Sequence, residues 1–429
     1  MDGLSSRCEP AETILGRLSM PTNVTIAGSG ESPLTIQAND GTRVTINPAL
    51  GGLYLADLDA GPGPDDYLVI ANPSATATTA RVTYIWANGS GLVQDVAVAA
   101  NSRQQFYLPT QVGLNGPSSV AVQSLTAGVP LDTEHVQAWN GWYAWRATEG
   151  AVPAATWYFA EGNVSTFEEY LAIFNPEPVA VSVTATAYRA GVSPTTGTVI
   201  IPAGPGRVRL RVRDWLGTVG DHATRLTATR LDTGAPALVV AERTAVWEAD
   251  QRGGASTPGA STLATTWHLA EGNRGAFDSY YAIVNPQATA QTVSVIYRHE
   301  NGFLYYGALT VGATSRATFT IPDFVPPGNL GMTVSAPLGI AVERSMYGGT
   351  TWTVGHAGVA SASAGYTWRF AKGDTTVTAT LWLPAQCRAT LYANAVPGLS
   401  AASFRTTVTA SVYVVAPGDN VAIAEWTFR

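Results

Sequence analysis

Short runs in which apolar and polar residues alternate recur along most of the chain. Three runs precede residue 50, at residues 24–26, 34–36 and 44–46, and a longer one spans residues 292–297. A period of two places successive side chains on opposite faces of a β-strand. Turn sequences such as Asn39-Asp40-Gly41 and Asn301-Gly302 separate the runs, and these pairs favour tight hairpins. The pattern predicts an all-β protein that begins with a small β element.

One phrase recurs and marks internal repeats. It reads W-Y-F-A-E-G at residues 157–162, W-H-L-A-E-G at 267–272 and W-R-F-A-K-G at 368–373, while residues 56–57 keep only Ala-Asp. An Asn-Pro pair follows in three copies, at residues 72–73, 175–176 and 285–286, and a tyrosine stands five residues before each. These tyrosines are Tyr67, Tyr170 and Tyr280. Units of roughly 100 residues built from short alternating runs are typical of β-sandwiches.

The repeats divide the chain into five predicted parts. Residues 1–52 form an N-terminal arm, with a weak helix signal before residue 20, and the small β element. Three β-sandwich repeats follow at residues 53–156, 157–266 and 267–367, and their tyrosines should occupy equivalent places. Residues 368–429 keep the opening phrase but lack an Asn-Pro pair, so we expect a divergent C-terminal β domain.

The succession of motifs resembles a tandem β-sandwich repeat found in secreted and surface proteins of actinobacteria and Chloroflexi. The shared elements are W-x-F/L-A-E-G, then Y-x-x-I-x-N-P, then Ser-Arg, then E-R-x-M-Y. The match covers about residues 53–373 and is clearest at 157–350. The resemblance implies immunoglobulin-like accessory modules, with no known catalytic residues to carry over.

Composition excludes some partners. A net charge of −7 argues against nucleic acid, which needs a basic surface. No stretch is long enough to cross a bilayer, and residues 1–4 lack the basic start and apolar run of an export signal. Cys8 and Cys387 have no metal-type spacing; they could pair with each other, pair with a neighbouring chain, or stay as free thiols. We expect no cofactor.

Charged and aromatic residues that recur in every copy are predicted to serve the fold, because three modules need three cores but rarely three active sites. The recurring carboxylates Glu161, Glu271, Glu242 and Glu343 could suit a hydrolase. We instead expect Glu161 and Glu271 to pair with arginines of the repeat, since a buried charge must be matched. The recurring tryptophans Trp157, Trp267 and Trp368 should pack in cores or between modules.

Two clusters belong to single modules and are candidates for binding. Four arginines alternate with apolar residues, which in a strand places four guanidiniums on one face: Arg207, Arg209, Arg211 and Arg213. That face could dock an acidic partner or polyanion, or simply guard a sheet edge in solvent. Four aromatic residues crowd into a loop of the first repeat and suit sugar or protein contacts, or burial between repeats: Trp139, Trp142, Tyr143 and Trp145.

A third cluster suggests a metal. Four aspartates lie in a Gly/Pro-rich stretch and could hold calcium through oxygen ligands, although their spacing is not that of an EF-hand: Asp57, Asp59, Asp65 and Asp66. No His or Cys set has metal-ligand or catalytic spacing, and no Gly-rich phosphate loop occurs.

These observations predict a non-enzymatic structural and interaction protein of an extracellular assembly. A phage virion component, such as a fibre, decoration or tail-associated protein, is the first expectation, favoured by the missing export signal and the short N-terminal arm. An exported bacterial surface adhesin or scaffold, which the resemblance favours, is an alternative. A carbohydrate-binding module array, or a glycosidase built on sandwiches, is another. Expected partners are other chains of an oligomer or larger complex and a surface glycan, with neither nucleic acid nor membrane.

Overall fold

The computed structural model confirms the predicted all-β, sandwich-type fold. It describes residues 25–27, 34–37, 43–46, 52–59, 65–86, 91–112, 116–139, 144–165, 167–203, 206–217, 220–247, 253–348 and 354–363, and seven strands between 367 and 428. The small N-terminal β element is confirmed as an antiparallel sheet of β1 (Thr25–Ala27), β2 (Leu34–Gln37) and β3 (Arg43–Ile46). The helix signal before residue 20 lies outside the described residues.

The first module pairs two four-stranded antiparallel sheets over one core. One sheet has the order β4 (Leu53–Asp59), β9 (Pro117–Ser124), β6 (Thr78–Trp86), β7 (Gly91–Val98). The other has the order β11 (Ala144–Glu149), β10 (Asp132–Trp139), β5 (Asp65–Asn72), β8 (Ser102–Tyr107), and helix α2 (Leu108–Val112) follows β8. Counting strands from the start of the module, the two orders are 1-6-3-4 and 8-7-2-5.

The second module repeats this plan. Its 1-6-3-4 sheet is β12 (Thr156–Phe159), β17 (Ala223–Arg230), β14 (Val181–Arg189), β15 (Val192–Ile201). Its 8-7-2-5 sheet is β19 (Gly253–Pro258), β18 (Val240–Trp247), β13 (Phe167–Asn175), β16 (Gly206–Arg211), and α3 (Val212–Leu216) follows β16.

In the third module, strands 6 and 7 are one long strand, β26 (Gly328–Gly348). Its first half pairs with β20 (Ala264–Leu269), β21 (Asn273–Arg274) and β23 (Gln291–His299), and β23 pairs with β24 (Leu304–Val311). Its second half pairs with β27 (Val354–Val359) and β22 (Asp278–Asn285), and β22 pairs with β25 (Ser315–Thr320). The 1-6-3-4 and 8-7-2-5 orders are therefore kept. Tyr67, Tyr170 and Tyr280 all lie on second strands, as expected.

The C-terminal part follows the same plan more closely than its sequence suggests, and we call it unit 4. One sheet is β28 (Thr367–Phe370), β33 (Val412–Val415), β30 (Ala389–Leu391), β31 (Asn394–Val396), which is again 1-6-3-4. The other is β34 (Ile423–Phe428), β29 (Val377–Trp382), β32 (Ala401–Arg405), which corresponds to 7-2-5.

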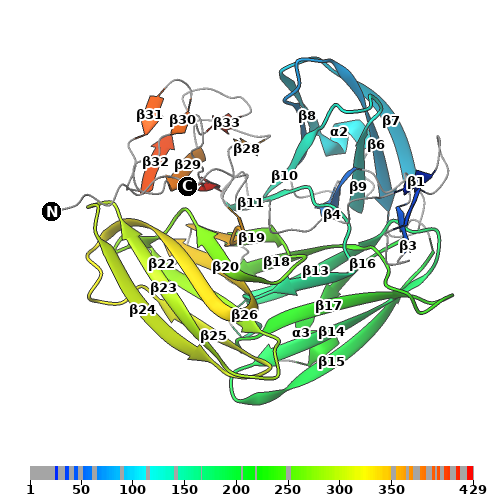
Figure 1. The fold of residues 1–429 in the computed structure, drawn as a ribbon. Coiled ribbons are helices and arrows are strands. Elements are labelled where there is room, and N and C mark those ends of the chain that lie inside the picture. Colours follow the sequence, from blue (N-terminus) through cyan, green and yellow to red (C-terminus); the bar gives the residue numbers. More distant parts are fainter. Residues whose placement is uncertain are drawn as a thin grey trace.

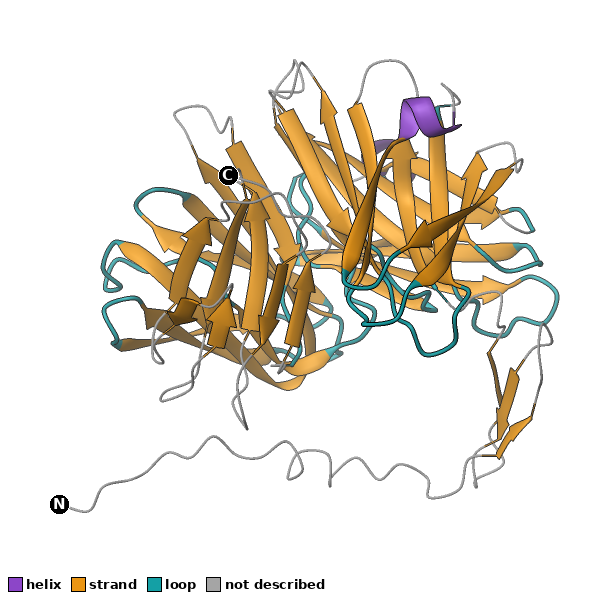
Figure 2. Cartoon of the chain, turned by 90° about the horizontal axis from the view of Figure 1, so that it is seen from above, coloured by secondary structure: helices purple, strands orange, loops and turns teal. Residues whose placement is uncertain are grey.

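The four units close into a ring. The seventh strand of each unit contacts the first strand of the unit before it: β18 meets β4, β26 meets β12, β34 meets β20, and β10 meets β28. Figure 1 shows the units in chain order around a centre, coloured blue to cyan, green, yellow and orange. Figure 2 shows the same body from above, built almost wholly of strands.

Each complete module has its own apolar core, and in the second and third modules the recurring tryptophan contributes to it. Trp157 and Trp267 are buried, as predicted, and their indole Nε1 atoms donate to the carbonyls of Val239 and Ile340 at 2.9 and 2.8 Å. Both acceptors stand three residues before the recurring glutamate of strand 7. The shared residue thus performs the same packing and hydrogen-bonding role in both modules.

Candidate functional site

The recurring glutamate of strand 7 holds one module to the module before it. Glu242 of the second module accepts hydrogen bonds through Oε2 from the backbone amides of Ala56 and Asp57 in the first, at 3.2 and 3.1 Å. Glu343 of the third module accepts in the same way from the amide of Glu161 in the second, at 3.0 Å. We call this contact the latch.

The residue whose amide is latched also offers a carboxylate to the next module. In the first latch, Asp57 is 3.0 Å from Nε of Arg209 and 3.7 Å from Nη2 of Arg207, both of the second module. Nη1 of Arg146, from the first module, lies 3.1 Å away. Burial alone would raise the pKa of Asp57, but the guanidiniums of Arg146, Arg209 and Arg207 hold it well below its usual range. Asp57 is therefore a buried anion matched by three cations.

The second latch repeats this arrangement with one variation. Glu161 lies 3.3 Å from Nη2 of Arg316, which occupies the place that Arg207 has in the second module. Arg243 donates to the carbonyl of Glu161 and lies 3.1 Å from Glu343. The guanidinium therefore joins the two partners of the latch. The predicted ion pair of Glu161 is confirmed, and it lies between modules rather than within one.

Glu271 is buried in the third module, as a latched residue should be. Nη1 of Arg344, the counterpart of Arg243, donates to its carbonyl at 2.7 Å. The register places Glu425 of β34 opposite Thr380 of β29, as Glu242 stands opposite Ala172 of β13. Glu425 therefore occupies, on the seventh strand of unit 4, the position that the latch glutamate has in the second module.

Burial perturbs both latch glutamates strongly. It raises the pKa of Glu343 to about 7 and that of Glu242 to about 7, against the opposing pull of Arg243 on Glu343 and of His135 on Glu242. The second carboxylate oxygen, Oε1, of each glutamate is buried, with no hydrogen-bond partner among the described residues. In each glutamate, Oε2 therefore accepts hydrogen bonds, whereas Oε1 is removed from water without a protein donor among the described residues, which explains the raised pKa.

The Asn-Pro pairs have a role that the sequence alone does not reveal. Asn285 is fully buried, and its Nδ2 donates to the carbonyls of Thr289, Val311 and Gly312 at 2.9, 3.3 and 2.7 Å. Its Oδ1 accepts from the amide of Gln287 at 3.1 Å. Asn72 and Asn175 make the same kinds of bond. The asparagine fixes the turn after strand 2, which explains its recurrence.

The arginine cluster does not form a free face of four guanidiniums. Arg207 and Arg209 lie on β16 but point into the junction with the first module, where Arg209 also stacks 3.8 Å from the ring centre of Tyr170. Arg211, at the end of β16, lies 2.6 Å from Glu168. Arg213 lies on α3 instead of the strand and donates to the carbonyl of Val164. The expected acidic partner is supplied by the chain itself.

The aspartates lie on strands rather than in a loop. Asp57 and Asp59 end β4, and Asp65 and Asp66 begin β5. Asp66 accepts from the amide of Asp59 at 2.6 Å and lies 2.6 Å from Nε2 of His135, while Asp65 accepts from the hydroxyl of Tyr107 at 2.9 Å. Across the part of the chain that is described, no three acidic, His or Cys side chains converge as a metal site would need. The aspartates thus bind protein groups.

The aromatic cluster is placed only in part. Trp139 ends β10 and Trp145 lies on β11, where Ala138 pairs with Trp145 and Trp139 pairs with Ala144. The two tryptophans thus belong to a hairpin stem, and their side chains lie outside what the structure describes. Trp142 and Tyr143 also lie outside the described residues, as do Cys8 and Cys387.

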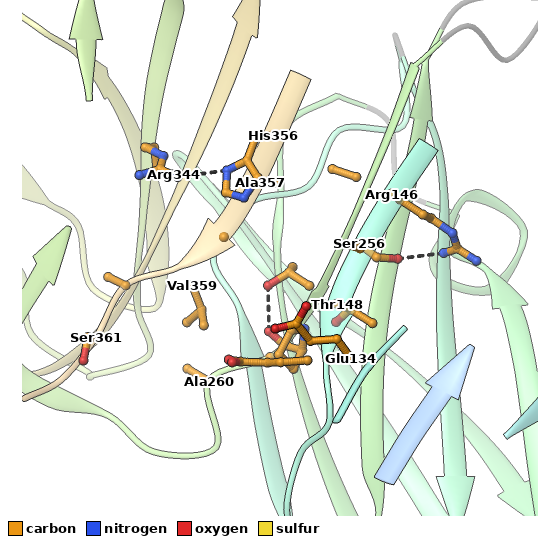
Figure 3. Close-up of a pocket in the computed structure, with 18 of the residues that line it drawn as sticks. Glu134, Arg146, Thr148, Ser256, Ala260, Arg344, His356, Ala357, Val359 and Ser361 are labelled. Carbon is orange, nitrogen blue, oxygen red and sulfur yellow. Dashed lines mark hydrogen bonds between the residues drawn. The ribbon is translucent and has the colours of Figure 1, made fainter. Parts of the chain in front are cut away.

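A pocket of about 410 Å³ lies where the eighth strands of the three complete modules meet. Figure 3 shows its walls, which come from β11, β19 and β27. Small apolar residues make up much of the lining, with polar groups among them. His356 accepts from Nη2 of Arg344 at 2.9 Å, and Ser256 accepts from Nη1 of Arg146 at 2.7 Å.

Two glutamates line one side of this pocket. Glu134 and Glu149 stand directly opposite each other on β10 and β11. Opposite residues in such a pair have Cβ atoms about 4.5–5.5 Å apart. Paired carboxylates in a pocket are what a glycosidase would need, so this is the place to test for one.

Comparisons with known proteins do not assign the chain to a family. No family model and no curated protein matches it. One similar solved structure is described as Thermotoga maritima 1070; it is 17% identical and covers 25% of this chain and 95% of its own, with a TM-score of 0.22. Another, a tetra-tandem repeat in the extending region of a large adhesion protein, is 12% identical and covers 88% and 99%, with a TM-score of 0.13. Similarities this weak carry no argument about function.

Within the described residues, no helix is long and apolar enough to cross a membrane.

Proposed function

We propose that this chain is a non-enzymatic structural and interaction protein, a rigid ring that serves as one part of an extracellular assembly. The latch supports this proposal most directly. The recurring carboxylates act at the junctions between modules: Glu161 and Glu343 pair with arginines, and Glu242 accepts hydrogen bonds from two backbone amides. They are thus engaged in holding modules together. What recurs serves rigidity, and what differs between modules remains for recognition.

The junctions between modules contain apolar contacts as well as ion pairs. This favours a rigid body over modules joined by flexible linkers. Tyr54, Ala56 and Ile85 of the first module pack with Ala172 and Phe174 of the second in one buried cluster. Interfaces that are large and hydrophobic restrict the relative motion of domains. A ring of such junctions presents its outer surfaces at fixed spacing.

The assembly proposal is tested on protein isolated from the organism that produces it. Isolated without denaturant, the chain should elute in a complex well above its own 44.9 kDa in light scattering coupled to gel filtration. Recovery as a monomer alone would contradict the proposal. The fraction that contains the complex decides between the settings: sedimentation with virus particles supports a virion component, and release with the cell envelope supports a surface adhesin or scaffold.

The glycosidase alternative rests on the opposed pair Glu134 and Glu149. We expect no turnover of chromogenic glycosides by the purified protein across pH 4–8. Turnover that is abolished in Glu149→Gln, but retained in Glu168→Gln, would assign catalysis to the pocket and overturn the non-enzymatic proposal. Glu168 is a suitable control because it forms a surface ion pair in another module.

A further inference from the structure

In the part of the chain that the structure describes, the seventh strand of unit 4 lacks the eighth-strand partner that its counterparts have. β10, β18 and the second half of β26 each pair with a second strand on one side and an eighth strand on the other. Within the described residues, β34 pairs with β29 alone. An unpaired edge exposes a row of amide and carbonyl groups that favour the addition of a further strand.

The chain places its eighth strands with regular spacing. Each eighth strand directly precedes the first strand of the next unit: β11 ends at Glu149 and β12 begins at Thr156, β19 ends at Pro258 and β20 begins at Ala264, and β27 ends at Val359 and β28 begins at Thr367. The strand that precedes the first module is β3, which ends at Ile46, and β4 begins at Leu53. Its connection is as long as the others.

The register is equally regular. The residue opposite the latch glutamate is Glu149, Pro258 or Val359, which stands eight or nine residues before the recurring tryptophan of the next unit. Leu53 has the tryptophan's place in the first module, since it is followed two residues later by Leu55 and three later by Ala56. Counting back from Leu53 gives Val44 or Thr45, in the middle of β3.

The connections themselves follow one route. Two residues beyond the partner of the latch glutamate, the chain forms a bridge with the first strand of its own unit: Ala151 with Tyr54, Ala260 with Tyr158, and Ser361 with His268. The same step from Val44 or Thr45 reaches Ile46 or Asn47, and the corresponding residue of β28 is Arg369. If β3 paired with β34, the chain could therefore continue into the first module through the same kind of bridge that the three other connections make.

We propose that β3 is the eighth strand of unit 4, and that it adds antiparallel to the free edge of β34 to close the ring. In this structure β3 pairs with β2 and stands at the opposite side of the ring from unit 4 (Figure 1), so docking requires β3 to move relative to β4. Its pairing with β2 uses one edge only, and the β1–β3 sheet can dock whole. A three-stranded sheet of such short strands gains stability from a larger neighbour.

Docking would also give the central pocket its fourth side. β11, β19 and β27 are the eighth strands around it, and β3 would be the fourth. The proposal thus names the segment that completes the ring and encloses the pocket, and it holds whether or not the ring is part of an extracellular assembly.

Cysteine pairs test the docked register. In a background with Cys8→Ser and Cys387→Ser, Ala424→Cys is combined with Thr45→Cys for one register and with Ile46→Cys for the other. Opposite residues in an antiparallel pair lie within reach of a disulfide. The control combines Thr45→Cys with Ser403→Cys on β32, the other edge of the same sheet. After mild oxidation, one of the two test pairs should cross-link within the monomer, by intact mass and non-reducing gel, while the control stays reduced.

Other results overturn the proposal. A cross-link found only in dimers would show that a second copy supplies the strand. If neither pair cross-links, hydrogen exchange on the unmodified protein decides: slow exchange along β34 that rises roughly tenfold or more in Val44→Pro supports docking, because proline removes one ladder bond. Fast exchange along β34 in the unmodified protein rejects it.

Discussion

At the scale of single residues, two arrangements recur in the molecule. One is a buried asparagine after strand 2, and the other is the latch between a strand-7 glutamate and backbone amides of the preceding module. The side-chain amides of Asn72, Asn175 and Asn285 each donate hydrogen bonds to two or three backbone carbonyls beside the turn. The glycine of the W-x-F/L-A-E-G phrase has a steric reason: a Cβ at Gly162 would lie 2.8 Å from Nε2 of His222. A residue recurs here because several modules need the same hydrogen bond or the same space.

Asn285→Ala should destabilise the protein without altering its fold. The change removes the donor of three hydrogen bonds, of which the one to Val311 is buried, and an unsatisfied buried group costs about 1–3 kcal/mol. The control is Asn301→Ala, in the turn after β23, where the side chain is exposed. Thermal unfolding should show a lower melting temperature for the first variant and little change for the second. Equal melting temperatures would show that the asparagine is not what fixes the turn.

The latch glutamates predict how stability depends on pH. The pKa of Glu343 rises from its ordinary 4.5 to about 7 in the folded protein, so the folded state holds this proton more tightly than the unfolded state. The free energy of unfolding must then fall as pH rises from about 4.5 to 7. His222 acts in the same direction above its ordinary pKa: burial lowers its pKa, but Glu169 more than offsets this and leaves it raised. The melting temperature should be higher at pH 5 than at pH 8.

Glu343→Gln tests the assignment, because glutamine keeps the shape of the side chain and does not titrate. Its melting temperature should vary less between pH 5 and pH 8 than that of the unmodified protein, while Glu242 preserves part of the trend. A pH dependence unchanged by the substitution would place the titrating group elsewhere.

At the scale of elements, strand 7 both builds its own module and holds the preceding one. One face of β18 lies over its own core while the other carries Glu242 and Thr244 to the first module. Strand 5 assists in the same way through Arg207. The sequence predicted an arginine face that could bind an external acidic partner or lie in solvent, whereas Arg207 and Arg209 lie in the junction with the first module. Alternation predicts which side chains share a face but not what covers that face.

Arg207→Met and Arg211→Met separate the two roles of that cluster. Arg207 is buried, lies 3.1 Å from Ser119 and is 3.7 Å from Asp57, so its loss leaves a buried carboxylate less well matched. Removing one partner of a buried pair costs about 3–5 kcal/mol, and the remaining arginines should keep the effect near the lower end. Arg211 forms an exposed pair with Glu168, and its replacement should not change the denaturation midpoint measurably. Equal midpoints would mean that the junction does not depend on Arg207.

The sequence predicted the strands well and their partners poorly, for a physical reason. Alternation, turn residues and repeated phrases can be recognised along the chain, so β1–β3 and the buried tryptophans followed from them. The latch joins Ala56 to Glu242, and the closure of the ring joins β10 to β28. These partners are so far apart in the sequence that no local pattern can predict their contact. Unit 4 lacks the Asn-Pro pair, so the sequence predicted a divergent β domain there. Its strand orders, which match those of the other units, could not be predicted from any local motif.

At the scale of the whole molecule, the ring makes neighbours of β10 and β28, which lie more than 220 residues apart in the sequence. Val69 and Ala71 alternate with the core residues Leu68 and Ile70 on β5, so they face away from the core of the first module. They are nevertheless fully buried or nearly so. β28 of unit 4 meets β10, which pairs with β5 in the same sheet. We therefore infer that unit 4 covers this outward face of the first module.

Val69→Asp should therefore loosen unit 4 more than the module that contains it. A charge placed in this junction loses its water without gaining a partner, while the core behind β5 keeps all its side chains. Hydrogen exchange in β28 and β33 should accelerate by on the order of tenfold or more, equivalent to at least ~1.4 kcal/mol. The control is Val93→Asp on β7, whose side chain is exposed and lies away from any junction, so exchange in unit 4 should not change. In a ring, damage on one side of the first module reaches the end of the chain; in an open string of modules, β28 and β33 would exchange as before, and that result would refute the closed arrangement.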